Sequence, residues 1–161
     1  MRTLAVSLSI ALATSLCNAQ WYWQNPLPQG NYLHGVIFTD ANTGAAVGDY
    51  GTIVRTTNGG TNWTCQSSGT TQALRKVFFL DANVGWAVGD SGTILHTTDA
   101  GTHWTSQSAG TTYGLVGLAF TDANNGTVVG WNGTISHTTN GGATWTSQSS
   151  GTLHPLLGVS F

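Results

Sequence analysis

The chain has 161 residues, a length that suits one ordinary domain. Only 6% of its residues are charged and none is glutamate, which argues against a helical bundle, whose exposed faces need Lys, Glu and Arg. Four basic against six acidic residues give a formal net charge of −2, which provides no basic field for nucleic acid or an anionic membrane. The 22 glycines and the Thr-rich, aromatic composition favour an all-β chain with many tight turns.

The first residues have the pattern of a secretory signal. Arg2 is the only charge before an apolar run over residues 4–16, and small residues precede an expected cleavage between Ala19 and Gln20. The run is too short for a helix that spans a membrane. The sequence therefore predicts a signal peptide over residues 1–19, no membrane span, and a secreted, periplasmic or cell-surface location.

Only one of the two cysteines remains after the expected cleavage of the signal peptide. Cys17 leaves with the signal, so Cys65 stands alone and the mature chain can form neither an internal disulfide nor a cysteine-based zinc site. The alternative, a lipoprotein signal with Cys17 as the lipidated residue, is disfavoured because bulky Leu16 stands where a small residue is expected.

After a single expected strand at residues 21–24, the chain repeats itself every 41 residues. The copies run over 31–71, 72–112 and 113–153, and 20 of the 41 positions are identical in all three. Residues 154–161 match the opening of another copy. A fixed period of this length indicates one supersecondary unit copied in tandem.

Each copy divides into four short strands separated by turns rich in Gly and Asx. In the first copy we expect strands over Leu33–Phe38, Ala45–Gly48, Thr52–Thr56 and Asn62–Ser67. We expect Leu33, and the pair Val36 and Phe38, to mark the buried sides of the first strand. Four strands of this length joined by tight turns make an up-and-down antiparallel sheet.

A repeat of four strands has the size of one propeller blade, and radial stacking would bury the face of each blade against the next. The sequence therefore predicts that residues 20–161 form an all-β, partial β-propeller of about three blades plus flanking strands. A linear β-solenoid is the alternative, disfavoured because solenoid coils usually have shorter repeats. Three blades cannot close a ring of four to eight. We therefore expect either a C-terminally truncated piece with an incomplete ring, or a ring that closes by association through its open edges.

The most regular part of the repeat is the motif [Ser/Thr]-x-[Asp/Asn]-x-Gly-x-x-Trp. Its residues are Thr56, Asn58, Gly60 and Trp63, then Thr97, Asp99, Gly101 and Trp104, then Thr138, Asn140, Gly142 and Trp145. The pattern resembles the Asp-box or BNR repeat of β-propellers. In this motif Thr and Asx can hydrogen-bond the turn backbone, Gly permits positive φ, and Trp packs over the hairpin. We therefore interpret these residues as structural.

The longer segment Phe79–Ile94 is similar to the subgroup of BNR propellers named after the photosystem II assembly and stability factor. The resemblance extends over residues 21–161. It implies a lumenal chaperone that binds a membrane-protein intermediate through a basic patch. Without residues 1–19 the chain has three basic against six acidic residues, a formal charge of −3, and so has little from which to build that patch. The photosynthetic role is therefore an alternative.

Enzymatic function finds little support in the residue pattern. Glycoside hydrolysis usually needs two carboxylates at the scissile bond, but the aspartates recur at fixed turn positions, namely Asp40, Asp81 and Asp122, then Asp49 and Asp90, with Asp99 in the motif. The five histidines have no zinc-ligand spacing and are expected to be isolated surface residues. We predict a non-enzymatic protein without cofactor or metal, and a fragment of an Asp-box glycoside hydrolase is a further alternative.

The copies disagree most on the propeller face that carries the second turn of each repeat. Tyr50 and Trp131 stand in that turn, and Arg75 and Lys76 stand near the start of the first strand of the second repeat. Such residues commonly anchor interfaces. We predict that these four form a binding face for a protein or glycan partner in a secreted scaffolding module.

Overall fold

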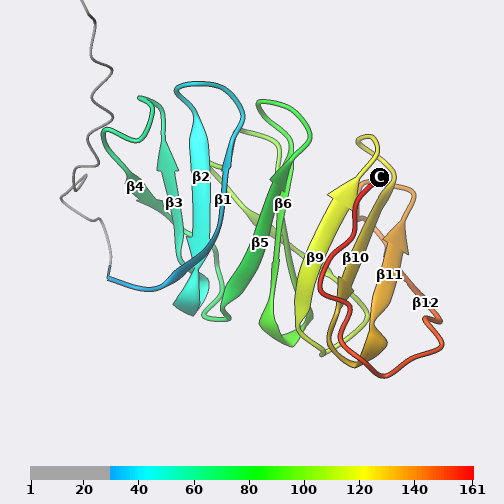
Figure 1. Cartoon of the computed structure of the whole chain (residues 1–161). Helices are drawn as coiled ribbons and strands as arrows, with labels where there is room; N and C mark the ends of the chain where they lie inside the picture. Colours follow the sequence, from blue (N-terminus) through cyan, green and yellow to red (C-terminus); the bar gives the residue numbers. More distant parts are fainter. Residues whose placement is uncertain (1–29) are drawn as a thin grey trace, which may run out of the picture.

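A computed structural model of the chain describes residues 30–161 (Figure 1). The expected signal peptide over residues 1–19, its cleavage between Ala19 and Gln20 and the expected strand at residues 21–24 lie outside the described residues. Among the residues described, no helix is long and apolar enough to cross a bilayer.

Each repeat folds into one four-stranded antiparallel sheet with its strands in sequence order. Blade 1 contains β1 (Leu33–Phe38), β2 (Gly44–Gly48), β3 (Ile53–Thr56) and β4 (Thr64–Gln66); blade 2 contains β5 (Leu74–Phe79), β6 (Gly85–Gly89), β7 (Thr93–Thr97) and β8 (Thr105–Ser108); blade 3 contains β9 (Leu115–Phe120), β10 (Gly126–Gly130), β11 (Ile135–Thr138) and β12 (Thr146–Gln148). Figure 1 shows the three sheets side by side, as blades of one arc. The prediction of an all-β partial propeller is confirmed.

The first three strands of blade 1 match the prediction within one residue, whereas the fourth is shorter than expected. The expected strand began at Asn62, but β4 begins at Thr64. The backbone N–H of Asn62 donates to Oδ1 of Asn58 at 2.9 Å, and the Thr61 hydroxyl donates to the Asn58 carbonyl, also at 2.9 Å. These bonds keep the chain in the turn, so the ladder to β3 forms only afterwards.

The hydrophobic core lies between neighbouring blades. Val47 and Ile53 of blade 1 pack with Leu74 and Val77 of blade 2, and all four side chains are at most 3% exposed. A second cluster joins blades 2 and 3 through Val88, Ile94, Leu115 and Leu118, which stand 41 residues further along the chain. Burial of an apolar side chain contributes about 1.5–3 kcal/mol, so the repeated interface stabilises the arc.

The outer side of blade 1 departs from the expected burial. Leu33, Val36 and Phe38 of β1 are 45%, 63% and 45% exposed, although the sequence pattern predicted a buried side for this strand. The equivalent Leu74 of blade 2 is fully buried because blade 1 packs against it. Within residues 30–161 no blade covers β1 in the same way.

Residues 154–161 continue the repeat in sequence and are assigned no strand of their own. The segment runs alongside β9 and β10 of blade 3 (Figure 1). The N–H of Leu156 donates to the carbonyl of Gly130 at 2.9 Å. The next strands of a blade are needed to build a ladder, and residues 154–161 have no such partner among the described residues.

The Asp-box residues form hydrogen bonds within the turn between the third and fourth strands. In blade 3 the Thr138 hydroxyl accepts the N–H of Gly142 at 2.9 Å and donates to Oδ1 of Asn140 at 3.0 Å. The Asn140 side chain accepts the N–H of Thr144 at 2.9 Å. Trp145 meets Phe120 edge to face, with ring centroids 6.0 Å apart.

We expect Thr138→Val to lower the free energy of unfolding by about 1–3 kcal/mol, because the buried N–H of Gly142 loses its acceptor. Thr138 is 1% exposed, whereas its neighbour Thr139 is exposed. Thr139→Val is therefore the matched control and should stay within about 0.5 kcal/mol of the parent. Urea unfolding followed by circular dichroism measures both, and equal effects of the two variants would contradict the structural role of the motif.

Candidate binding face

The turn between the second and third strands of each blade is a single turn of 3-10 helix. These turns are η1 (Asp49–Gly51), η2 (Asp90–Gly92) and η3 (Trp131–Gly133). The backbone N–H of Asp49 donates to the carbonyl of Tyr32 at 2.9 Å, and the same bond recurs in blades 2 and 3. Each turn therefore packs beside the segment that leads into the first strand of its blade. We call the surface formed by the three turns and these three segments the turn face.

The second residue of each turn has positive φ, which is uncommon for residues other than glycine. Tyr50 has φ 55°, and Ser91 and Asn132 have φ 56°. The glycine that follows allows close packing, because a Cβ on Gly51 would lie 2.0 Å from the carbonyl oxygen of Thr70. The result is a tight turn that leaves the side chain of Tyr50 74% exposed.

The turn face carries all of the exposed Tyr and Trp side chains among residues 30–161. Tyr32 and Tyr50 of blade 1 are 80% and 74% exposed, and Tyr113 and Trp131 of blade 3 are 49% and 50% exposed. The tryptophans of the three Asp-boxes are partly buried against their own hairpins. Exposed aromatic side chains are therefore concentrated on one face of the arc.

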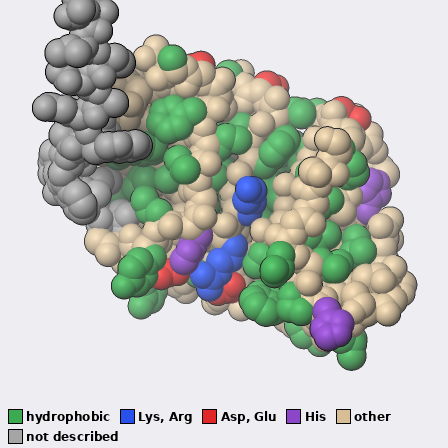
Figure 2. All heavy atoms as spheres, in the orientation of Figure 1, with side chains coloured by type: hydrophobic (Ala, Val, Ile, Leu, Met, Phe, Trp, Pro, Cys, Tyr) green, Lys and Arg blue, Asp and Glu red, His purple; other side chains and the backbone are tan. Residues whose placement is uncertain are grey.

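A row of charged side chains lies between these aromatic groups. Asp90 accepts two hydrogen bonds from Arg75, from Nε at 3.0 Å and from Nη2 at 2.6 Å. Nη1 of Arg75 lies 3.9 Å from Oδ1 of Asp49 and 3.0 Å from Nε2 of His34. In Figure 2 the lower edge of the molecule shows this mixture of acidic, basic and histidine side chains with hydrophobic groups on either side. Arg75 of blade 2 thus connects blade 1 to its own turn.

Two contacts compete for one nitrogen of His34. Nε2 lies 2.6 Å from Oδ1 of Asp49 and 3.0 Å from Nη1 of Arg75. A ring nitrogen either carries a proton or offers a lone pair, so Nε2 can donate to Asp49 or accept from Arg75, but not both. The hydrogen bonds to Asp90 raise the pKa of the Arg75 guanidinium above its ordinary value, so this side chain stays charged.

Trp131 extends the row into blade 3. A Cβ on Gly114 would lie 2.9 Å from Cδ1 of Trp131 and 3.3 Å from Oδ1 of Asp90. The indole therefore packs over Gly114, next to the carboxylate that holds Arg75. Only glycine leaves room for this arrangement.

The structure unites part of the predicted binding face. Arg75 donates to Asp90, Trp131 and Asp90 both border Gly114, and Tyr50 directly follows Asp49. Arg75 is not a free cation, since it is paired with Asp90. Lys76 lies further along β5, where it pairs in register with Val88; it is exposed and makes no ion pair within residues 30–161.

The four predicted residues did not include Tyr32, His34 and Tyr113, and Asp49 and Asp90 were interpreted as turn residues alone. The sequence did indicate Tyr32, His34 and Tyr113 as variable positions, since the three copies differ at each of them. Asp49 and Asp90 are repeated at one position, so their contact with Arg75 becomes visible only when the blades are placed side by side.

A sequence model of the family described as Photosynthesis system II assembly factor YCF48 matches residues 14–111, more than half of the chain. The chain belongs to this family. None of the curated proteins compared with the chain matches it.

Solved structures agree with the fold of a YCF48-family chain. YCF48 bound to a D1 peptide is 24% identical with a TM-score of 0.68, over 77% of this chain and 42% of that one. YCF48 from Cyanidioschyzon merolae is 23% identical with a TM-score of 0.65, over 80% of this chain and 43% of that one. An ancestral GH74 enzyme is 17% identical with a TM-score of 0.59, over 70% and 18%. The chain therefore spans less than half the length of the YCF48 structures that it matches.

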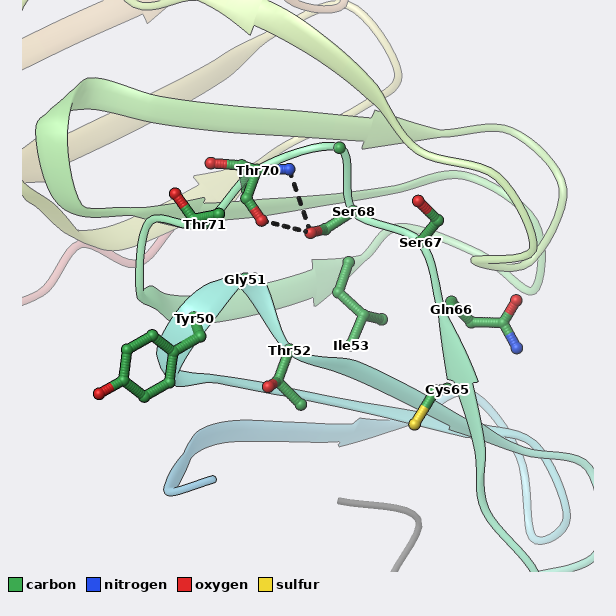
Figure 3. A pocket seen from close by; sticks show the side chains of 11 residues that line it. Tyr50, Gly51, Thr52, Ile53, Cys65, Gln66, Ser67, Ser68, Thr70 and Thr71 are labelled. Carbon is green, nitrogen blue, oxygen red and sulfur yellow. Dashed lines mark hydrogen bonds between the residues drawn. The ribbon is translucent and has the colours of Figure 1, made fainter. Parts of the chain in front are cut away.

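A shallow recess of about 670 Å³ lies beside Tyr50 in this YCF48-family chain (Figure 3). It is bounded by η1, the start of β3 and the loop that follows β4. The Ser68 hydroxyl in that loop donates to the carbonyl of Thr70 at 3.1 Å and accepts its N–H at 3.3 Å. A similar recess of about 500 Å³ occurs at the same position of blade 3. Tyr50 therefore lines one edge of this recess.

The opposite face of the arc carries the other aspartates. Asp81 accepts the backbone N–H of Asn83 and Val84 at 2.7 and 2.8 Å, and these bonds lower the pKa of its carboxyl. The equivalent residues of blades 1 and 3 make the same bonds. The backbone N–H of His103 and its ring lower the pKa of Asp99 to about 2. The interpretation of these carboxylates as turn residues is confirmed.

The expectation of isolated surface histidines is wrong for several of the five. His103 contacts Asp99 at 2.6 Å, and His34 contacts Asp49. His96 stacks on Trp86 with ring centroids 4.8 Å apart, and burial lowers its pKa. Within the described part of the chain, no group of three or more His, Cys, Asp or Glu is placed to hold a metal ion.

Proposed function

We propose that the turn face is the binding surface of a non-enzymatic propeller module, and that its ligand is a polypeptide segment of a partner protein. The observation that carries this proposal is the concentration of Tyr32, Tyr50, Tyr113 and Trp131 on one face. Tyr and Trp are enriched among residues that dominate interface energies, because they combine large apolar area with a polar group.

The row from His34 to Asp90 supplies the polar part of such an interface. Asp49, Arg75 and Asp90 have side chains that are 26%, 34% and 35% exposed, so their positions are fixed by packing while their outer atoms face solvent. Fixed charges of this kind contribute more to register and orientation than to affinity. A bound segment would lie across the row, with aromatic contacts at both ends.

The contacts of the carboxylates support a non-enzymatic role. Glycoside hydrolysis needs one carboxyl group that delivers a proton and another that acts as base or nucleophile. Asp49 and Asp90 both face the guanidinium of Arg75. The likeness to an ancestral GH74 enzyme concerns the fold alone, and function depends on the site rather than on the fold.

The finer proposal is an assembly-factor role outside the cytoplasm, with residues 1–19 as the export signal. A solved YCF48 structure contains a bound D1 peptide, which makes that peptide the natural first ligand to test. The family match over residues 14–111 supports the same choice. A glycan remains the alternative ligand, and a glycan array with the same variants distinguishes the two.

Trp131→Ala is expected to weaken binding of a fluorescently labelled D1 peptide about 30-fold, because truncation of an interface tryptophan typically costs about 2 kcal/mol or more. Fluorescence anisotropy measures the dissociation constant. Tyr50→Ala should weaken binding in the same direction. Failure of the parent chain to bind any D1 peptide would contradict the assembly-factor role.

Arginine provides a matched control for the polar row. Arg75→Ala should weaken peptide binding, whereas Arg55→Ala should not, because Arg55 donates to the carbonyl of Ala100 near the Asp-box turn of blade 2. Equal effects of both changes would point to general electrostatics and contradict a site on the turn face. Glycan binding that depends on Trp131 would keep the turn face and replace the peptide as its ligand.

A further inference from the structure

The exposed apolar side of blade 1 is the same surface that the other two blades bury. Leu33 and Val36 of β1 are 45% and 63% exposed. Their equivalents 41 residues along, Leu74 and Val77 of β5, are 0% and 3% exposed because blade 1 packs on them. Apolar side chains that are exposed here but buried at the same repeat positions elsewhere make this side of blade 1 a candidate contact surface.

The surface that fits this side of a blade recurs in the same chain. Blade 1 offers Val47 and Ile53 to blade 2, and blade 2 offers Val88 and Ile94 to blade 3. The equivalents on the far side of blade 3 are Val129 and Ile135. Because the interface is built twice from the same repeat positions, the far side of blade 3 is complementary to the outer side of blade 1.

Residues 154–161 already occupy that complementary surface. A Cβ on Gly35 of β1 would lie 3.4 Å from Cα of Lys76 in the next blade. The equivalent contact on blade 3 joins Gly117 to Gly158, whose Cα would lie 3.0 Å from a Cβ on Gly117. The segment therefore lies on blade 3 as the first strand of another blade would lie.

The residues of the segment also match β1 in type. Leu156 and Val159 stand at the repeat positions of Leu33 and Val36, and both are partly buried on blade 3. Leu157 points away and is 72% exposed. Residues 154–161 and β1 are thus alternative occupants of one surface.

We propose that two copies of this chain associate head to tail, with the outer side of blade 1 in one copy docked on blade 3 of the other. Docking displaces residues 154–161 of the second copy, so the segment competes with self-association. The contact is heterologous, because different surfaces meet. Each copy carries both surfaces, so a pair of copies has two such contacts available. The proposal is independent of ligand binding on the turn face.

Sedimentation velocity of the whole chain over a range of concentrations tests this proposal through three variants. Val36→Lys should weaken the dimer at least about tenfold, because a charge enters an apolar contact without a partner. Leu156→Asp should strengthen it severalfold, because it loosens the competing segment. Leu157→Asp is the matched control and should leave the dissociation constant unchanged. Val159→Asp repeats the Leu156 experiment at a second position, and circular dichroism verifies that each variant is folded.

Val36→Lys and Leu156→Asp are expected to shift the dissociation constant of the dimer in opposite directions, which a general loss of stability would not produce. A chain that is monomeric at every concentration, in the parent and in the Leu156 variant, would overturn the proposal. So would a dimer that Val36→Lys leaves unchanged. A lower melting temperature for Val36→Lys at unchanged mass would assign the surface to an occupant from the same chain, and would overturn the proposal as well.

Discussion

Trp86→Ala is expected to lower the free energy of unfolding by about 3–5 kcal/mol, the range for a large aromatic side chain removed from a packed core. Trp86 is fully buried in β6 and stacks on Phe120 of blade 3, with ring centroids 3.6 Å apart and the planes at 14°. On its other side it stacks on His96. One side chain thus joins two blades, and its loss leaves a cavity inside their interface.

Thermal and urea unfolding measure this effect. For a chain of this size we expect a fall in melting temperature of roughly 10 °C. Trp131→Ala is the matched control, because Trp131 is half exposed on the turn face and its truncation leaves no enclosed cavity. A loss below about 1 kcal/mol for Trp86→Ala, or an equal loss for both variants, would show that the blades do not depend on this contact.

The position of Trp86 illustrates which parts of the fold the sequence predicts. Its equivalents are Ala45 and Thr127, so comparison of the copies indicates a variable strand position and gives no sign of a buried aromatic. The structure shows why this variation is tolerated, since the ring stacks on Phe120 and fills the space between two blades. The order of the strands and the Asp-box turns are local properties, so the 41-residue repeat predicts them. Packing between blades depends on pairs of residues in different copies, so the repeat does not predict it.

At the candidate site, too, the sequence predicts the local turns but not the contacts between blades. The turns, their positive φ and the exposure of Tyr50 follow from the Gly-rich pattern of one repeat. The bridge from Asp49 through Arg75 to Asp90 joins two blades, and His34 reaches Arg75 across 41 residues. The spacing of residues within one strand or turn cannot predict such contacts, because they join residues of different blades. Disagreement between copies pointed to Arg75 and Trp131, which both lie beside Asp90, and to Lys76, which lies further along β5.

Gly92→Ala should cost about 2–5 kcal/mol and should also disturb the turn face. Gly92 ends η2 with φ +67°, a conformation that costs an L-residue about 1–2 kcal/mol. In addition, a Cβ there would lie 2.0 Å from the carbonyl oxygen of Thr111. Backbone has to move to relieve such an overlap, which typically adds about 1–3 kcal/mol.

Gly110 separates these two causes. It has φ +69°, nearly the same as Gly92, but a Cβ there would meet no atom within 4 Å. Gly110→Ala should therefore cost only the conformational part, about 1–2 kcal/mol. The difference between the two variants in the free energy of unfolding, measured with urea, gives the steric part alone.

Because η2 also positions Asp90, Gly92→Ala should weaken binding at the turn face when assayed below its unfolding transition, and Gly110→Ala should not. Equal stability of the two variants would mean that the turn can shift away from Thr111 at little cost, and that the turn face is less rigid than its contacts indicate.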